Sequence, residues 1–208
     1  YSRQMLHPFF CVPESRPEIL GHRGAAGTAP ENTLEAFAEG LRRGADILES
    51  DIHLSRDGVP VLLHDPEVDR TTDGSGAVCD LNLEEIQKLD AGYRFTPERS
   101  ETFAFRGQDL RIPTLEQAFR RFPDARFNLE LKAGGEHCAS QVIKLVKALD
   151  RENRTLLTAG DAALMDQLVA SAKEQNASPA FGACTRDAAA FARSAAQNLA
   201  PPPIPMAL

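Results

Sequence analysis

The chain of 208 residues is predicted to form an α/β fold, in which helices pack outside a parallel sheet. Short apolar runs alternate with amphipathic stretches along the sequence, which is the pattern that such a sheet produces. The composition, 42% hydrophobic and 25% charged residues, is sufficient for a sizeable core. We therefore expect one domain over residues 1–208.

The apolar runs predict six strands, at residues 18–21, 47–54, 60–64, 126–132, 155–158 and 180–184. The first helix is expected to have Asn32 as its N-cap, with Glu35 three residues later as in a capping box, and to stop near Gly44. A short helix over residues 83–89 would be capped by Asn82. Later helices are predicted at residues 114–122, 138–150, 162–174 and 186–199, the last ended by prolines 201–203.

About fifty residues separate His64 from Thr114, whereas connections in such folds are usually about 2 to 6 residues long. This stretch contains turn residues, scattered aromatic residues and one short helix candidate. We expect an inserted subdomain over about residues 66–112, placed over the site as a wall of the substrate pocket.

The net charge of -7 disfavours nonspecific attraction to nucleic acid or to an anionic membrane. No apolar run approaches the roughly 20 residues that a membrane-spanning helix needs, and the chain does not begin like a signal peptide. We expect a cytoplasmic protein with no nucleic-acid partner and no stable membrane insertion; the oligomeric state is left open. The four cysteines lack any Cys-x-x-Cys pairing, so buried free thiols are expected at Cys11, Cys79, Cys138 and Cys184.

Two carboxylates, Glu49 and Asp51, interrupt a stretch that otherwise has the pattern of a buried strand. Side chains alternate along a strand, so these two point to the same face, and Leu48 and Ile52 point to the other. Burying two negative charges side by side is costly unless a cation is present. This pair therefore indicates half of a divalent metal site.

A second strand repeats the pattern, with Asn128, Glu130 and Lys132 on one face. A third carboxylate would complete an oxygen shell for Mg²⁺ or Ca²⁺, together with water and substrate oxygens. The lysine next to it indicates a ligand that brings negative charge. The alternative is that Glu130 and Lys132 simply form an ion pair.

Two histidines follow apolar runs where strands are expected to end. His22 and Arg23 come after the first predicted strand, and His64 comes at the end of the third. Active sites assemble at the carboxyl ends of parallel strands. Imidazole titrates near neutral pH, so one histidine can remove a proton while the other supplies one. His53 shares the parity of Asp51 but is expected to be structural.

Five short motifs occur in order over about residues 19–132: His22-Arg23-Gly24, Pro30-Glu31-Asn32-Thr33, Glu49-x-Asp51, His64-Asp65 and Glu130-x-Lys132. Their order and approximate spacing resemble those of the glycerophosphodiester phosphodiesterase family, of bacterial type. The resemblance implies that Glu49, Asp51 and Glu130 bind Mg²⁺ or Ca²⁺, that His22 and His64 are the acid and base, and that Arg23 and Lys132 contact the phosphate.

The resemblance also implies a fold and a reaction. The fold would be a TIM (β/α)8 barrel with an insertion after the third strand, where this chain has its long segment. The reaction would be the hydrolysis of small glycerophosphodiesters to glycerol 3-phosphate and an alcohol such as choline or ethanolamine. Which histidine is the acid and which the base stays open.

Such a barrel needs eight strands and typically about 250 residues, and only six strands can be placed in this sequence. The chain also lacks tryptophan, which members of the family usually carry in a late strand. We expect an incomplete barrel, in a truncated product or a fragment of a longer enzyme. The alternative functions are a lysophospholipase D, a phosphoinositide phospholipase, and an inactive remnant that binds metal and phosphate.

Overall fold

The computed structural model describes residues 6–11, 16–97, 102–197 and 199. The strands are β1 (Leu20–Gly21), β2 (Ile47–Leu54), β3 (Pro60–Leu62), β4 (Arg126–Leu131), β5 (Thr155–Ala159) and β6 (Ala180–Phe181). The α-helices are α1 (Leu34–Arg42), α2 (Leu83–Ile86), α3 (Leu115–Arg121), α4 (Gly135–Ala148), α5 (Ala162–Glu174) and α6 (Thr185–Ala196). Three short 3₁₀ helices are η1 (Pro8–Phe10), η2 (Val78–Asp80) and η3 (Glu152–Arg154). The prolines expected to end the last helix lie outside the described residues.

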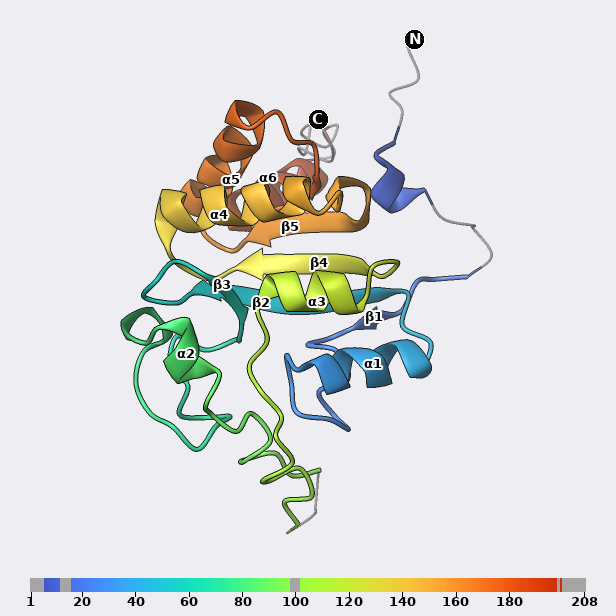
Figure 1. Cartoon of the computed structure of the whole chain (residues 1–208). Helices are drawn as coiled ribbons and strands as arrows, with labels where there is room; N and C mark the ends of the chain where they lie inside the picture. The colour runs from blue at the N-terminus through green and yellow to red at the C-terminus, as the bar shows by residue number, and fades with distance from the viewer. Residues whose placement is uncertain (1–5, 12–15, 98–101, 198, 200–208) are drawn as a thin grey trace.

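The six strands form one sheet in the order β1-β2-β4-β5-β6, with β3 beside β2 (Figure 1). Neighbours along that path are parallel, as predicted. The exception is β3, which runs antiparallel to the end of β2 and pairs Ile52 with Leu62. The expectation that His64 follows a parallel strand is therefore wrong. A chain that leaves β2 at Leu54 and enters β3 at Pro60 is too short for a parallel crossover, which needs a dozen or more residues.

One face of the sheet is apolar and carries the helices. Leu48, Ile52, Phe127 and Leu129 are fully buried in one hydrophobic cluster with residues of α1, α3, α4 and α5. Phe127 packs edge-on against both Phe37 and Phe119, with ring centroids 5.7 and 5.5 Å apart. Burial alternates along β4, so the opposite face carries its polar residues. This alternation places Glu49, Asp51 and Glu130 on the face away from the helices.

The first helix begins one residue later than expected. Its N-cap is Thr33, whose hydroxyl accepts a hydrogen bond from the Ala36 amide at 3.1 Å. Asn32 has a φ of 58° and turns its side chain away from the helix, so its prediction as the cap is wrong. The cap predicted for the short helix α2 is confirmed, because Asn82 and Glu85 form a complete capping box, but the helix ends at Ile86 rather than at residue 89.

The long segment between β3 and α3 has a small hydrophobic cluster of its own. Val68, Val78, Ile86 and Ile112 are buried in it together with Val61 of β3. Figure 1 shows this segment, with α2, extending away from the layer of α3 and α4. Its status as a separate subdomain stays a prediction.

Two of the four cysteine thiols are exposed rather than buried. Cys138 and Cys184 are buried, whereas Cys11 and Cys79 are exposed, which corrects the expectation of four buried thiols. Cys79 lies in η2, on the outside of the inserted segment. Burial raises the pKa of the Cys138 thiol to about 12. No described helix is both long enough and apolar enough to cross a membrane.

Candidate active site

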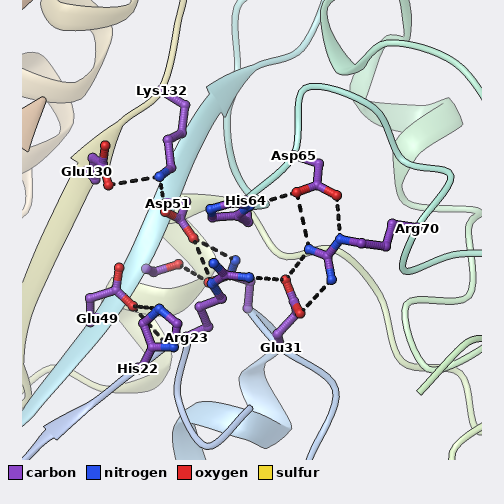
Figure 2. Close-up of polar contacts among 12 residues, drawn as sticks. His22, Arg23, Glu31, Glu49, Asp51, His64, Asp65, Arg70, Glu130 and Lys132 are labelled. Carbon is purple, nitrogen blue, oxygen red and sulfur yellow. Dashed lines mark hydrogen bonds and ion pairs between the residues drawn. The ribbon is translucent and has the colours of Figure 1, made fainter. Parts of the chain in front are cut away.

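The seven side chains predicted for the site lie close together on the polar face of the sheet (Figure 2). They come from the turn after β1, from β2, from the segment after β3, and from the end of β4 and the residue that follows it: His22, Arg23, Glu49, Asp51, His64, Glu130 and Lys132. Figure 2 draws Arg23 and Asp51 between the two histidines.

Asp51 is the centre of this group, with a side chain only 2% exposed. The Lys132 ammonium lies 3.0 Å from its Oδ1, and the Arg23 Nε lies 3.6 Å from its Oδ2. The Asn32 amide donates to Oδ2 at 3.2 Å, and its own oxygen accepts from the Ser50 hydroxyl at 2.7 Å. A buried carboxylate is tolerated when cations and hydrogen-bond donors surround it, and this one is surrounded on both oxygens.

Lys132 joins Asp51 to Glu130, whose Oε2 lies 2.8 Å from the ammonium. The two carboxylates are direct partners in the pairing of β2 with β4. Burial opposes the charge of Lys132, but its bonds to Glu130 and Asp51 raise its pKa above the ordinary value. The ion pair considered as the alternative for Glu130 and Lys132 therefore exists, and it exists on the face that carries the other site residues.

Glu49 is less well compensated than Asp51. It accepts a hydrogen bond from the Arg23 amide at 2.8 Å, and the His22 Nε2 lies 3.9 Å away. Burial raises the pKa of Glu49, and the charge of Asp51 adds to this effect. Its partner across the sheet is Asn128, whose buried side-chain oxygen has no hydrogen-bond partner.

These groups fit a hard divalent cation by their chemistry, because all the candidate ligands are oxygens. A buried orphan oxygen on Asn128 and an under-compensated Glu49 are features that a cation would satisfy. Within the part of the chain that the structure describes, no three acidic, histidine or cysteine side chains lie close enough together to form a metal cluster as they stand. The Lys132 ammonium forms ion pairs with both Asp51 and Glu130.

His64 is held from two sides. Its Nδ1 lies 2.7 Å from Asp65 Oδ1, so this nitrogen donates to the carboxylate and Nε2 is left to exchange protons. His53, whose pKa is lowered by burial, has its Nε2 3.1 Å from the His64 carbonyl oxygen. The expectation that His53 is structural agrees with this contact. The antiparallel course of β3 brings His64 here, since the Leu63 amide donates to the Asp51 carbonyl at 3.1 Å.

A chain of ion pairs links His64 to Arg23 through Arg70, which belongs to the inserted segment. The Arg70 Nε lies 2.5 Å from Asp65, and its two terminal nitrogens lie 2.6 and 2.9 Å from Glu31. Hydrogen bonding to Arg70 lowers the pKa of Asp65 to about 2. Burial opposes ionisation of Glu31, yet its bonds to Arg70 and Arg23 hold its pKa below the ordinary value. Arg23 lies 3.0 Å from Glu31 at the far end.

The sequence did not assign four residues that the structure brings into the site: Glu31, Asn32, Asp65 and Arg70. Three of them occur within the quoted motifs, but a motif in a loop does not show which side chain faces inward. Arg70 lies in the long segment, and no periodic pattern marks it. The signal available was the presence of an arginine six residues after His64, which is too common to be specific.

Comparison with known proteins settles the family. The model of the glycerophosphoryl diester phosphodiesterase family matches residues 22–200. The chain belongs to this family. It is 41% identical over 145 residues to a glycerophosphodiester phosphodiesterase of Caldanaerobacter subterraneus. The aligned region covers 67% of this chain and 56% of that protein. The chain spans about half the length of the curated relatives it matches.

Solved structures of the same family share the fold. A glycerophosphoryl diester phosphodiesterase domain of Mycobacterium tuberculosis matches with a TM-score of 0.79 and 27% identity, over 90% of this chain and 67% of that chain. A phosphodiesterase of Oleispira antarctica, in complex with the product sn-glycerol-3-phosphate, matches with a TM-score of 0.67 and 28% identity, over 88% of this chain and 73% of that chain. The predicted fold class is confirmed: the parallel strands β1, β2, β4, β5 and β6 form part of a TIM barrel. The antiparallel strand β3 lies outside this parallel set, so five rather than six of the described strands belong to the barrel.

Proposed function

We propose that this chain carries the active site of a metal-dependent glycerophosphodiester phosphodiesterase, which hydrolyses a small glycerophosphodiester to glycerol 3-phosphate and an alcohol. The observation that carries the proposal is the convergence of two histidines, two cationic side chains and three carboxylates on one face of the sheet. Family membership and a relative that holds sn-glycerol-3-phosphate support the substrate class.

The charge of the site supports a divalent cation. Five carboxylates face only three cationic side chains: Glu31, Glu49, Asp51, Asp65 and Glu130 against Arg23, Arg70 and Lys132. An anionic phosphodiester would add to this negative excess, so a bound cation is needed to attract it. Glu49, Asp51 and Glu130 would hold Mg²⁺ or Ca²⁺, which when bound supplies positive charge for the nonbridging oxygens.

Lys132 and Arg23 would bind the phosphate. Each is now paired with carboxylates, and Lys132 is only 21% exposed. If Asp51 and Glu130 held the cation, the Lys132 ammonium that now pairs with them would be available to a phosphate oxygen. Both cations would then stabilise the negative charge that builds up on the phosphorus oxygens.

The two histidines have different surroundings, which supports different roles. Asp65 keeps the proton of His64 on Nδ1, so its Nε2 can accept a proton from the attacking hydroxyl, of water or of the substrate's own glycerol. The side chain of His22 is 66% exposed and reaches Glu49 only at 3.9 Å. We assign to His22 the delivery of a proton to the departing alcohol oxygen.

The test is turnover of glycerophosphodiesters with Mg²⁺ or Ca²⁺, measured as release of glycerol 3-phosphate, in the wild type and in His22→Ala and His64→Ala. Each substitution is expected to lower kcat by about 10²- to 10⁴-fold with an unchanged melting temperature. His137→Ala, which removes an exposed histidine on α4, is the matched control and should keep full activity. Retained activity in either site variant would contradict the assignment.

Two further measurements separate the alternatives. A lysophospholipase D or phosphoinositide phospholipase would prefer lysophosphatidylcholine or phosphatidylinositol to water-soluble diesters. An inactive remnant would show a higher melting temperature with Mg²⁺ or Ca²⁺ but no turnover of any substrate. Asp51→Asn should abolish the metal-dependent rise in melting temperature, whether the chain is an active enzyme or an inactive remnant, because the substitution removes the negative charge of a proposed ligand.

A further inference from the structure

A cavity of about 230 Å³ adjoins the site and is not used by any step above. Its walls come from two segments: Pro30 and Glu31 precede α1, and Arg70, Arg94 and Phe95 belong to the inserted segment. Glu31 is shared, because it also lies 3.0 Å from Arg23, the proposed phosphate ligand. The volume is below the roughly 300 Å³ at which pockets for drug-sized ligands begin, so the cavity suits a small group.

The position of this cavity fits one half of the substrate. A phosphodiester held by Arg23 carries an alcohol group on each of two oxygens of its tetrahedral phosphorus, so the two groups extend in different directions. Glu31 forms the border between Arg23 and the cavity, so an alcohol group on this side would enter it. Most of the lining lies in the inserted segment, which was expected to form a wall of the substrate pocket.

The charges in the cavity wall do not cancel. Glu31 is fully used, because its two oxygens accept from Arg70 and Arg23. Arg70 is neutralised in turn by Glu31 and Asp65. Arg94 donates from Nε to the neutral Thr72 carbonyl at 2.9 Å, and it makes no ion pair with any residue that the structure describes. Arg94 therefore leaves a positive charge and its terminal N–H donors for a ligand.

The same wall is poorly suited to a quaternary ammonium group. Such cations are recognised by the faces of several aromatic rings or by an unpaired carboxylate. Among the described lining residues the only aromatic ring is that of Phe95, which packs edge-on against Phe105 at 5.4 Å. The only carboxylate is that of Glu31, which is already paired with two arginines.

We propose that this cavity binds the alcohol half of the substrate and that Arg94 selects an alcohol that is rich in acceptor oxygens and carries no cationic group, such as glycerol or inositol. The inference rests on the proposed function. It replaces the expectation of choline or ethanolamine, because the guanidinium of Arg94, which no described carboxylate pairs with, would repel both ammonium groups and donate to hydroxyl oxygens.

The experiment compares kcat/KM for glycerophosphoglycerol and glycerophosphoinositol with that for glycerophosphocholine and glycerophosphoethanolamine, at one Mg²⁺ concentration. The polyol diesters are expected to be better substrates by about tenfold, since a few hydrogen bonds and one repulsion separate the two groups. Arg94→Gln should remove most of this preference. Arg106→Gln is the matched control, because Arg106 lies over the Tyr93 ring nearby but does not line the cavity.

Titration calorimetry of the full chain with the same four diesters gives a second readout that does not need turnover. Tighter binding of the polyol diesters without turnover would overturn the proposed function and support the inference. Turnover or binding that favours glycerophosphocholine, or an unchanged preference in Arg94→Gln, would overturn the inference and leave the activity standing. Neither turnover nor binding of any diester would overturn both.

Discussion

Asp65 shows how one side chain can act through a neighbour. It accepts a hydrogen bond from His64 Nδ1 and is itself held by Arg70, so it fixes both the ring orientation and the tautomer of the histidine. Asp65→Asn should lower kcat by about 10²-fold or more with little change in KM, because an amide neither enforces the Nδ1 proton nor stabilises the charged imidazole. Steady-state kinetics with the preferred glycerophosphodiester would measure kcat and KM separately.

The control for this substitution is Asp69→Asn, which changes a nearby carboxylate that accepts a hydrogen bond from the Gly76 amide.

A folding measurement adds an independent check. The pKa of Asp65 is lowered from 3.8 to about 2. Its ion pair therefore contributes its full stability above pH 3.8, and this contribution is lost as the pH falls from there through about 2. The wild type should exceed Asp65→Asn by about 1 kcal/mol in unfolding free energy at pH 7 and by less near pH 2. A constant difference would contradict the assignment.

The sequence predicted the site residues that lie on or next to strands, because alternation shows which side chains share a face. This alternation predicts that Glu49 and Asp51 share one face of β2, and that Glu130 lies on the polar face of β4. Glu31 and Arg70 could not be found in the same way, since loop conformation depends on tertiary contacts that have no periodic signal. Arg70 meets Glu31 across 39 positions of sequence, and only the folded chain shows that pairing.

Among the elements, the start of α1 separates a structural residue from a site residue. Thr33 caps the helix, whereas Asn32 is 1% exposed and bonds to Asp51 and Ser50. Thr33→Ala should cost about 1 kcal/mol of stability and leave kcat unchanged. Asn32→Ala should cost about 2 to 4 kcal/mol, because it removes two buried hydrogen bonds and places alanine at a positive φ. Urea unfolding and steady-state kinetics would measure both.

Asn32→Gly tells strain apart from lost bonding, since glycine accepts a φ of 58° without penalty. It should fall between the other two variants in stability but should weaken metal binding as much as Asn32→Ala, because Asp51 loses the same donor. Equal stability of Asn32→Ala and Thr33→Ala would contradict the larger contribution assigned to the buried hydrogen bonds of Asn32.

The direction of β3 could have been derived from the sequence by counting. Only residues 55–59 separate β2 from β3, and Gly58 in that stretch has a φ of 79°, as tight turns between antiparallel strands require. The apolar run alone does not give the direction of the strand, which is why the alternating pattern of strands and helices predicts a parallel strand here. The antiparallel return is what allows His64 to lie beside β2 rather than at the far edge of the sheet.

In the whole molecule, β3 separates two hydrophobic clusters. Leu62 belongs to the main cluster between sheet and helices, while Val61 belongs to the smaller cluster of the inserted segment. The segment also contributes Arg70 and Arg94 to the polar side of the fold. The core that holds the inserted segment is therefore distinct from the core that holds the metal-ligand candidates.

Two matched truncations should show whether these clusters unfold separately. Phe127 contacts Phe37 and Phe119, so Phe127→Ala should cost about 3 to 5 kcal/mol and raise amide exchange throughout β2, β4 and α4. Ile86, which is also fully buried, lies in the smaller cluster, so Ile86→Ala should raise exchange mainly between residues 66 and 112. Hydrogen-exchange mass spectrometry would measure both patterns. If Ile86→Ala raised amide exchange in β4 and α4 as much as in the inserted segment, the two clusters would form one cooperative unit.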